Sequence, residues 1–133
     1  MLNYCLDSNA VSDFLNSNKK VTQNLLKALQ NGDTFSIPVI VYYEVVCGLV
    51  TCKKYAKLRI FNSLYETATP LLLNEKVAKK SVEIYEKLHK GTLIEDNDIF
   101  IAAISMVNDC ILVTANTRHF ERVESLNFVN WRE

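Results

Sequence analysis

The chain has 133 residues, of which 49% are hydrophobic and 23% charged. This composition is typical of a globular protein, and its length favours a single domain over 1–133 with one hydrophobic core. Because 15 basic residues balance 15 acidic ones, the chain is not a protein that coats nucleic acid through bulk positive charge.

Strands and helices alternate along the whole sequence. Helices are predicted where apolar residues recur every three or four positions, with helix-capping residue types at Asp7, Ser8 and Asn9 and with Pro38 suited to a first helical turn. In chain order, the predicted elements are a strand at 2–6, a helix at 8–16, a helix from 21 that ends at 31–33, a strand at 34–37, a helix at 39–50, a helix at 53–65, a strand at 68–73, a helix from 77 that ends at Gly91, a helix at 98–108, a strand at 110–114, a short helix at 117–122 and a strand at 127–131.

This alternation predicts an α/β fold of three layers, in which a mainly parallel sheet is covered by helices on both faces. The run 39–50 is apolar almost all round, which predicts a buried helix. In parallel sheets, ligands bind beyond the carboxyl ends of the strands, where the strand order reverses. Asp7 directly follows the first predicted strand, so it lies where a functional group is expected.

The cysteines and the apolar runs indicate a cytoplasmic protein without a membrane segment. Asn3 and Asp7 interrupt the N-terminus too early for a signal peptide, and no run approaches the ~20 apolar residues that cross a bilayer. The four cysteines form no Cys-x-x-Cys pair, and neither His89 nor His119 completes a zinc spacing. All four lie in or beside apolar runs, where a free thiol behaves as a small hydrophobe.

One basic cluster comprises Lys53, Lys54, Lys57 and Arg59. Its simplest interpretation is a solvated helix face. The alternative is an uneven placement of basic residues that serves nucleic-acid binding in a chain of zero net charge.

Three acids stand in apolar surroundings, where an isolated charge is costly. Helix capping or the helix dipole would account for Asp7 and Asp98 taken singly. Glu44 lies in the middle of a predicted helix, where it cannot cap the helix. A purely structural role for Glu44 would therefore be a buried ion pair with an arginine or lysine. If the three meet in one cleft, their mutual repulsion favours protonation unless a divalent cation is present. Mg²⁺ and Mn²⁺ prefer such oxygen ligands, whereas zinc prefers His and Cys, so the acids point to metal-dependent phosphodiester cleavage.

The motifs "LDSNA", "YYEVVCG", "DNDIFIAAI", "VTANTRHFERV" and "NFVNW", in this order, resemble the PIN-domain ribonucleases. More narrowly, they are similar to the VapC-type toxins of bacterial VapBC toxin–antitoxin modules. The resemblance implies a PIN-like nuclease domain with Asp7, Glu44 and Asp98 as catalytic residues. It implies Mg²⁺ or Mn²⁺ as cofactor, held by Asp7 and Asp98 and by Glu44 directly or through water. The ion lowers the pKa of water and offsets charge on the leaving oxygen.

Five further residues match accessory positions of the family. Ser8 follows the first acid, and its hydroxyl is expected to orient Asp7 or a water. Asn116 stands where many PIN domains have a fourth acid; its neutral amide is a weaker metal ligand, which Asp96 is a candidate to supplement. Thr114 and Arg118 are expected near the same rim, with Arg118 available for a phosphate.

The resemblance also implies a function and partners. The expected activity is cleavage of tRNA, rRNA or mRNA, which inhibits translation and is neutralised by a cognate VapB-type antitoxin. Homodimers are implied as well, with the helices near 39–65 as a surface for either partner. Two alternatives remain: a PIN-like module that binds RNA or protein without cleavage, and a phosphotransferase using Asp7 as nucleophile. The latter requires a second aspartate where the chain has Asn9, which is better interpreted as a turn or capping residue.

Overall fold

The computed structural model describes residues 1–88 and 94–133, whose strands form one all-parallel sheet. The strands are β1 (Asn3–Leu6), β2 (Thr34–Pro38), β3 (Thr69–Leu71), β4 (Ile111–Val113) and β5 (Phe128–Val129). Their order across the sheet is β3-β2-β1-β4-β5. The predicted α/β fold with a parallel sheet is confirmed. Each predicted strand is present: four are shorter than predicted, and the strand predicted at 34–37 extends by one residue to Pro38.

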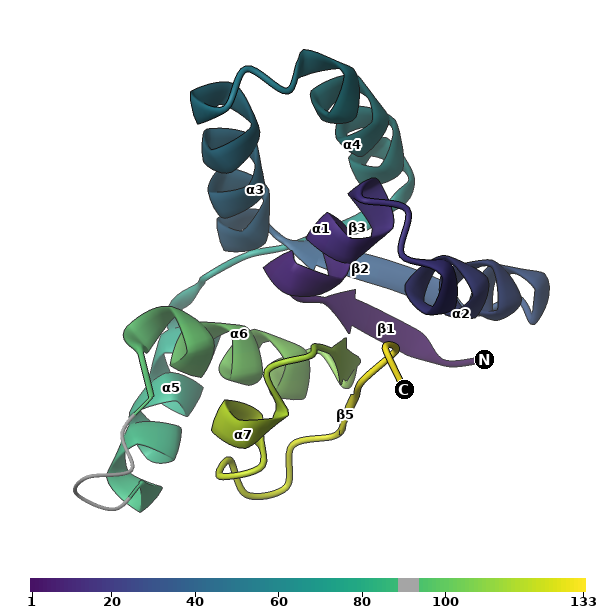
Figure 1. Cartoon of the computed structure of the whole chain (residues 1–133). Helices are drawn as coiled ribbons and strands as arrows, with labels where there is room; N and C mark the ends of the chain where they lie inside the picture. Colours follow the sequence, from purple (N-terminus) through teal and green to yellow (C-terminus); the bar gives the residue numbers. More distant parts are fainter. Residues whose placement is uncertain (89–93) are drawn as a thin grey trace.

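The helices cover both faces of this sheet, as Figure 1 shows. They are α1 (Ser8–Leu15), α2 (Lys19–Gln30), α3 (Val39–Thr51), α4 (Tyr55–Thr67), α5 (Glu75–Lys87), α6 (Asp96–Val107) and α7 (Thr117–Phe120). The helices α1 to α4 lie on one face, and α5 to α7 lie on the other. Right-handed crossovers explain this division, because β1 to β3 progress toward one edge of the sheet while β4 and β5 lie on the opposite side of β1.

Side chains with oxygen acceptors begin several of the helices. Asn18 accepts a hydrogen bond from the backbone N–H of Val21 at the start of α2, and Asn74 does the same for Val77 at the start of α5. The helix predicted to open at Asp98 begins two residues earlier, with Glu95 as its N-cap. The predicted helix end at Gly91 lies outside the described residues.

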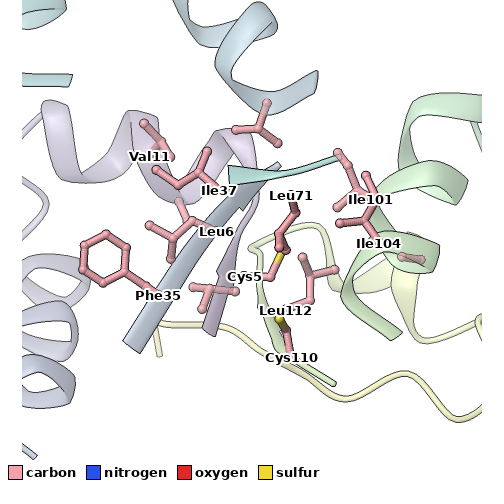
Figure 2. Close-up of a cluster of buried hydrophobic side chains, with 14 of the residues drawn as sticks. Cys5, Leu6, Val11, Phe35, Ile37, Leu71, Ile101, Ile104, Cys110 and Leu112 are labelled. Carbon is pink, nitrogen blue, oxygen red and sulfur yellow. The ribbon is translucent and has the colours of Figure 1, made fainter. Parts of the chain in front are cut away.

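The core is built from the alternating faces of the short strands (Figure 2). Cys5 and Leu6 are both buried, although consecutive strand residues point to opposite faces. One face packs against Val11 of α1, and the other packs against Ile101 and Ile104 of α6. The sheet is therefore apolar on both sides, which leaves its carboxyl edge as the place for polar groups.

The expectation that the helix at 39–50 is buried is wrong. Val41 and Val45 of α3 face the core, but Tyr43 is 69% exposed and Val50 is 45% exposed. Tyr55, at the start of α4, is exposed as well. Although α3 is apolar almost all round, one of its faces packs against the core and the other is an exposed apolar face.

The four cysteines differ in their exposure to solvent. Cys5 and Cys110 are buried, as expected of small hydrophobes, whereas Cys47 and Cys52 are free and exposed. Burial raises the pKa of the Cys5 thiol well above its ordinary value and that of Cys110 to about 11, so both remain protonated. Of the helices described at residues 1–88 and 94–133, none is long and apolar enough to span a bilayer.

Candidate active site

The carboxyl ends of β1 and β4 lie side by side at the reversal of the strand order. Leu6 pairs with Val113 in the register of the sheet, so the residues that follow them, Asp7 and Thr114, are neighbours. From this point, the chain after β1 crosses to one face and the chain after β4 to the other. Such a position is where ligands bind in parallel sheets.

Asp7 is 3% exposed, and both of its carboxylate oxygens accept hydrogen bonds. Oδ1 accepts from the backbone N–H of Ser8 at 2.8 Å, which makes Asp7 the N-cap of α1. Oδ2 accepts from Thr114 Oγ1 at 2.9 Å and from Asn9 Nδ2 at 3.1 Å. Burial raises the pKa of Asp7, as does the negative charge of Asp98, while these three hydrogen bonds oppose the increase.

The interpretation of Asn9 as a turn or capping residue is wrong. Asn9 lies within the first turn of α1, and its side-chain oxygen accepts from the backbone N–H of Ala115 at 2.9 Å. Its amide nitrogen also lies 3.2 Å from Thr114 Oγ1. Asn9 thus fixes the start of α1 against the end of β4.

Glu44 projects from α3 and has no ion-pair partner within residues 1–88 and 94–133. Its Oε1 is buried and forms no hydrogen bond with any residue that the structure describes. Burial raises the pKa of Glu44 first, followed by the charges of Asp7, Asp98 and Glu95. The alternative of a permanent ion pair with an arginine or lysine is therefore wrong for the described chain, and the acids at 7, 44 and 98 share one electrostatic environment.

Asp98, in the first turn of α6, contacts His119, which has no zinc-ligand spacing in the sequence. Its Oδ2 lies 3.0 Å from His119 Nδ1, and the same nitrogen lies 3.1 Å from Asn116 Nδ2. An ionised carboxylate only accepts hydrogen bonds, so His119 Nδ1 carries the hydrogen and donates a hydrogen bond to Asp98 Oδ2. A half-turn of the Asn116 amide then presents its oxygen rather than its NH₂ group to this N–H.

The other predicted accessory residues are placed differently. Ser8 bonds Asp7 through its backbone N–H and also lines a cavity that contains Glu44. Asp96 is exposed at the first residue of α6, and its neighbour Glu95 adds to the increase in the pKa of Glu44 after burial, Asp7 and Asp98. Arg118 is exposed in α7. Glu95 had no signal in the sequence beyond its position before the helix.

The donor set at this edge suits a hard cation better than a soft one. Among the described residues, no group of three or more His, Cys, Asp and Glu side chains is gathered closely enough to hold a metal ion unaided. The oxygens nonetheless include an unpartnered, buried Glu44 Oε1 beside the negative charges of Asp7 and Asp98. Mg²⁺ typically binds one or two carboxylates and keeps several waters, so these residues fit it, whereas zinc is bound mainly by His and Cys side chains.

A parallel sheet with acidic side chains at the end of a strand and in the flanking helices defines a class of α/β protein with an acidic site at the carboxyl edge of the sheet. The family model of the PIN domain matches residues 4–126. Ribonuclease VapC2 of Rickettsia felis is 31% identical over 133 residues, covering 96% of this chain and 97% of the relative. Ribonuclease VapC2 of Haemophilus influenzae is also 31% identical over 133 residues, covering 98% and 99%. The chain therefore belongs to the PIN-domain family, in its VapC-type branch.

Solved structures agree with this assignment. The structure of VapBC2 from Rickettsia felis bound to a DNA fragment from their promoter contains a chain that superposes with a TM-score of 0.84 at 27% identity, covering 98% of this chain and 99% of that one. VapBC-1 from nontypeable Haemophilus influenzae gives the same TM-score of 0.84 at 23% identity, with 99% and 100% covered, and shows the shared fold.

Proposed function

We propose that this chain is an endoribonuclease that depends on Mg²⁺ or Mn²⁺ and acts as the toxin of a VapBC-type module. The observation that carries this proposal is Glu44: its buried Oε1 has no hydrogen-bond donor among the described residues, and the charges that act on it most, those of Asp7 and Asp98, are also acidic. An arrangement of this kind is unfavourable unless a cation binds. The names of the relatives, which are ribonucleases, support the choice of RNA as substrate.

In this proposal, Asp7, Glu44 and Asp98 hold the ion directly or through water. When bound, the cation acidifies the attacking water and offsets the charge that develops on the phosphate. Ser8, Asn9 and Thr114 fix the orientation of the Asp7 carboxylate.

His119 fixes Asp98 and leaves that residue's second oxygen available. Asn116 turns its amide toward His119, which makes it a positioning residue rather than a fourth ligand. Asp96 and Arg118 are exposed near the helices that carry the site, where they are available to the substrate.

We further propose that the RNA is a tRNA, an rRNA or a message, whose cleavage inhibits translation. A VapB-type antitoxin is the proposed inhibitor, because solved relatives include toxin–antitoxin complexes. The exposed apolar side chains of Val39, Tyr43 and Val50 on α3 support a homodimer or an antitoxin contact at this helix. The exposed thiols of Cys47 and Cys52 support a reducing cytoplasm.

The activity is tested by incubating the purified chain with total RNA and Mg²⁺ or Mn²⁺, and by mapping the cleavage sites by RNA sequencing. EDTA and the variants Asp7→Asn and Asp98→Asn are expected to abolish cleavage. Cleavage that persists with EDTA, or equally in the variants, contradicts the proposal. RNA binding without cleavage under every condition would instead support the non-cleaving module. Co-purification with the product of an adjacent short reading frame, together with the mass of the complex, tests the antitoxin and the dimer.

A further inference from the structure

The geometry points to a phosphate-binding site for the RNA strand in the groove between α1 and α3, with Lys57 and Lys54 as the residues that bind the phosphate. The inference rests on the proposed ribonuclease activity and adds to it a site that positions the strand beside the cleaved bond. The groove has a volume of about 330 Å³. It is lined by Ser8, Ser12, Leu15, Asn16, Glu44, Val45, Gly48, Leu49, Lys54 and Lys57.

The groove joins the acidic site to a basic end. Ser8 and Glu44 line it next to Asp7, while Asn16, at the C-terminal end of α1, lines it together with Lys54 and Lys57 at the start of α4. The eight residues of α1, from Ser8 to Leu15, span about 12 Å. An RNA strand whose cleaved phosphate lies at the acids would therefore be long enough to place another of its phosphates at the lysines.

The two lysines are not neutralised by the protein. In the described part of the chain, neither forms an ion pair with a carboxylate. Lys57 donates a hydrogen bond to Asn16 Oδ1, a neutral acceptor that fixes the ammonium at the groove without cancelling its charge. An ammonium is a point charge well suited to a phosphate oxygen, and it retains donors for one.

Gly48 is an independent indication that the groove is kept open. This glycine lies inside α3, where glycine costs roughly 1 kcal/mol relative to alanine. Apart from its own helical turn, a Cβ at Gly48 would meet no atom of the described residues within 4 Å, so no packing against them requires a glycine here. Because Gly48 lines the groove, a long side chain at this position would occupy the space that the proposed strand needs.

The first test measures binding of a fluorescently labelled, single-stranded oligoribonucleotide by anisotropy, in EDTA and over a range of KCl concentrations. We expect Lys57→Gln and Lys54→Gln each to weaken binding at low salt by roughly tenfold or more, the effect of about one hydrogen bond to a charged group. The slope of log affinity against log salt should decrease by about 0.7 for each lysine removed. Lys57→Arg should retain most of the affinity.

Two neighbouring positions provide matched controls. Lys53 and Arg59 belong to the same basic cluster but do not line the groove. Lys53→Gln and Arg59→Gln should leave the affinity and the slope within about a factor of two of the wild type. An equal loss of RNA affinity in these control variants and in Lys54→Gln and Lys57→Gln overturns the inference. It would show that RNA binds to a diffuse basic surface and not to a defined phosphate-binding site.

Gly48→Gln tests the groove without changing any charge. Glutamine is the better helix former, and the space at Gly48 is open, so the thermal midpoint should not fall. Binding should nonetheless weaken at least as much as in Lys57→Gln. Unchanged binding by a folded Gly48→Gln variant overturns the inference.

Cleavage with Mg²⁺ separates this inference from the proposed activity. In the groove variants, KM should rise several-fold while kcat stays within about a factor of two, because the lysines bind the strand away from the reacting phosphate. If the wild type cleaves RNA, and the lysine and Gly48 variants bind and cleave it as well as the wild type does, the proposed phosphate-binding site is wrong and the ribonuclease stands. If neither the wild type nor any variant cleaves, but the lysine and Gly48 variants bind RNA less tightly than the wild type, the phosphate-binding site stands and the ribonuclease is wrong.

Discussion

Thr114 Oγ1 donates a 2.9 Å hydrogen bond to Oδ2 of Asp7 and so connects the ends of two adjacent strands. The same oxygen accepts from the backbone N–H of Asn116 at 3.0 Å, which fixes the turn that leads to α7. Because Thr114 is 1% exposed, water does not compete for these bonds. The orientation of Asp7 therefore depends on a residue 107 positions away in the sequence.

Replacing Thr114 by valine should destabilise the chain and shift the pKa of Asp7. The shape is nearly retained, but a buried carboxylate loses one donor and the Asn116 N–H loses its acceptor, at a cost of about 1–3 kcal/mol. The bond from Thr114 lowers the pKa of Asp7, so its loss raises that pKa further. The acidic limb of the pH–activity profile should consequently move to higher pH. Urea unfolding and a pH series of cleavage rates measure the two effects.

Thr114→Ser is the matched control for the valine variant. Serine retains the hydroxyl and removes only a methyl group, so its cost should be about 1 kcal/mol and its pH profile should match the wild type. A valine variant with an unchanged pH profile would show that the hydroxyl does not control the ionisation of Asp7.

Glu44→Gln should stabilise the metal-free chain at neutral pH. The pKa of Glu44 is raised in the folded state by burial and by the neighbouring acids. Between the ordinary pKa and this raised value, the folded chain binds more protons than the unfolded chain, so the free energy of unfolding decreases as pH rises through that interval. Glutamine is neutral throughout and avoids this loss. The variant and the wild type should differ little at about pH 4 and diverge by pH 7.

Urea denaturation in EDTA at the two pH values checks this expectation. Glu86→Gln is a suitable control, because Glu86 is an exposed acid on α5. A Glu44→Gln variant that is less stable than the wild type at pH 7 contradicts the expectation and would indicate a favourable partner for the carboxylate.

Much of the fold was predictable because its local signals agree. The strand ending at Leu6, the cap at Asp7 and the helix after it follow from adjacent residues, and the alternation of elements then requires a parallel sheet. The position of Asp7 at the carboxyl edge follows from the same reasoning. Glu44 and Asp98 were identifiable as acids in apolar surroundings.

The contacts within the site were not predictable in the same way. Asn9 resembles a capping residue locally, yet its partners Thr114 and Ala115 lie 105 and 106 positions away. His119 had one usable signal, since it follows Asn116 by three residues in a helical segment and therefore shares its face. The exposure of Tyr43 was missed because an all-apolar helix does not indicate which side faces the sheet.

His119→Ala should lower activity by about tenfold or more without a large effect on stability. The imidazole orients Asp98 through a 3.0 Å contact, and losing a partner that orients a ligand typically costs 10- to 100-fold in affinity or activity. Asparagine offers an N–H near the position of Nδ1, so His119→Asn should restore part of the loss. The measurements are kcat and the Mg²⁺ concentration at half-maximal activity. A lower Mg²⁺ requirement in the alanine variant would mean that His119 competes with the ion for Asp98.

Divalent metal should raise the thermal midpoint of the folded chain, because the acids at 7, 44 and 98 repel one another in its absence. An ion that binds only the folded state stabilises it by mass action, by about 2.7 kcal/mol at a concentration one hundred times its Kd. EDTA should reverse the increase.

Scanning calorimetry over a series of Mg²⁺ and Mn²⁺ concentrations measures this effect, and Asp98→Asn and Glu44→Gln provide the comparison. Each variant removes one charge from the site, so each should begin at a higher midpoint than the wild type and gain less from the metal. A gain in Glu44→Gln equal to that of the wild type would place the ion away from Glu44 and would remove the main support for a metal-dependent site.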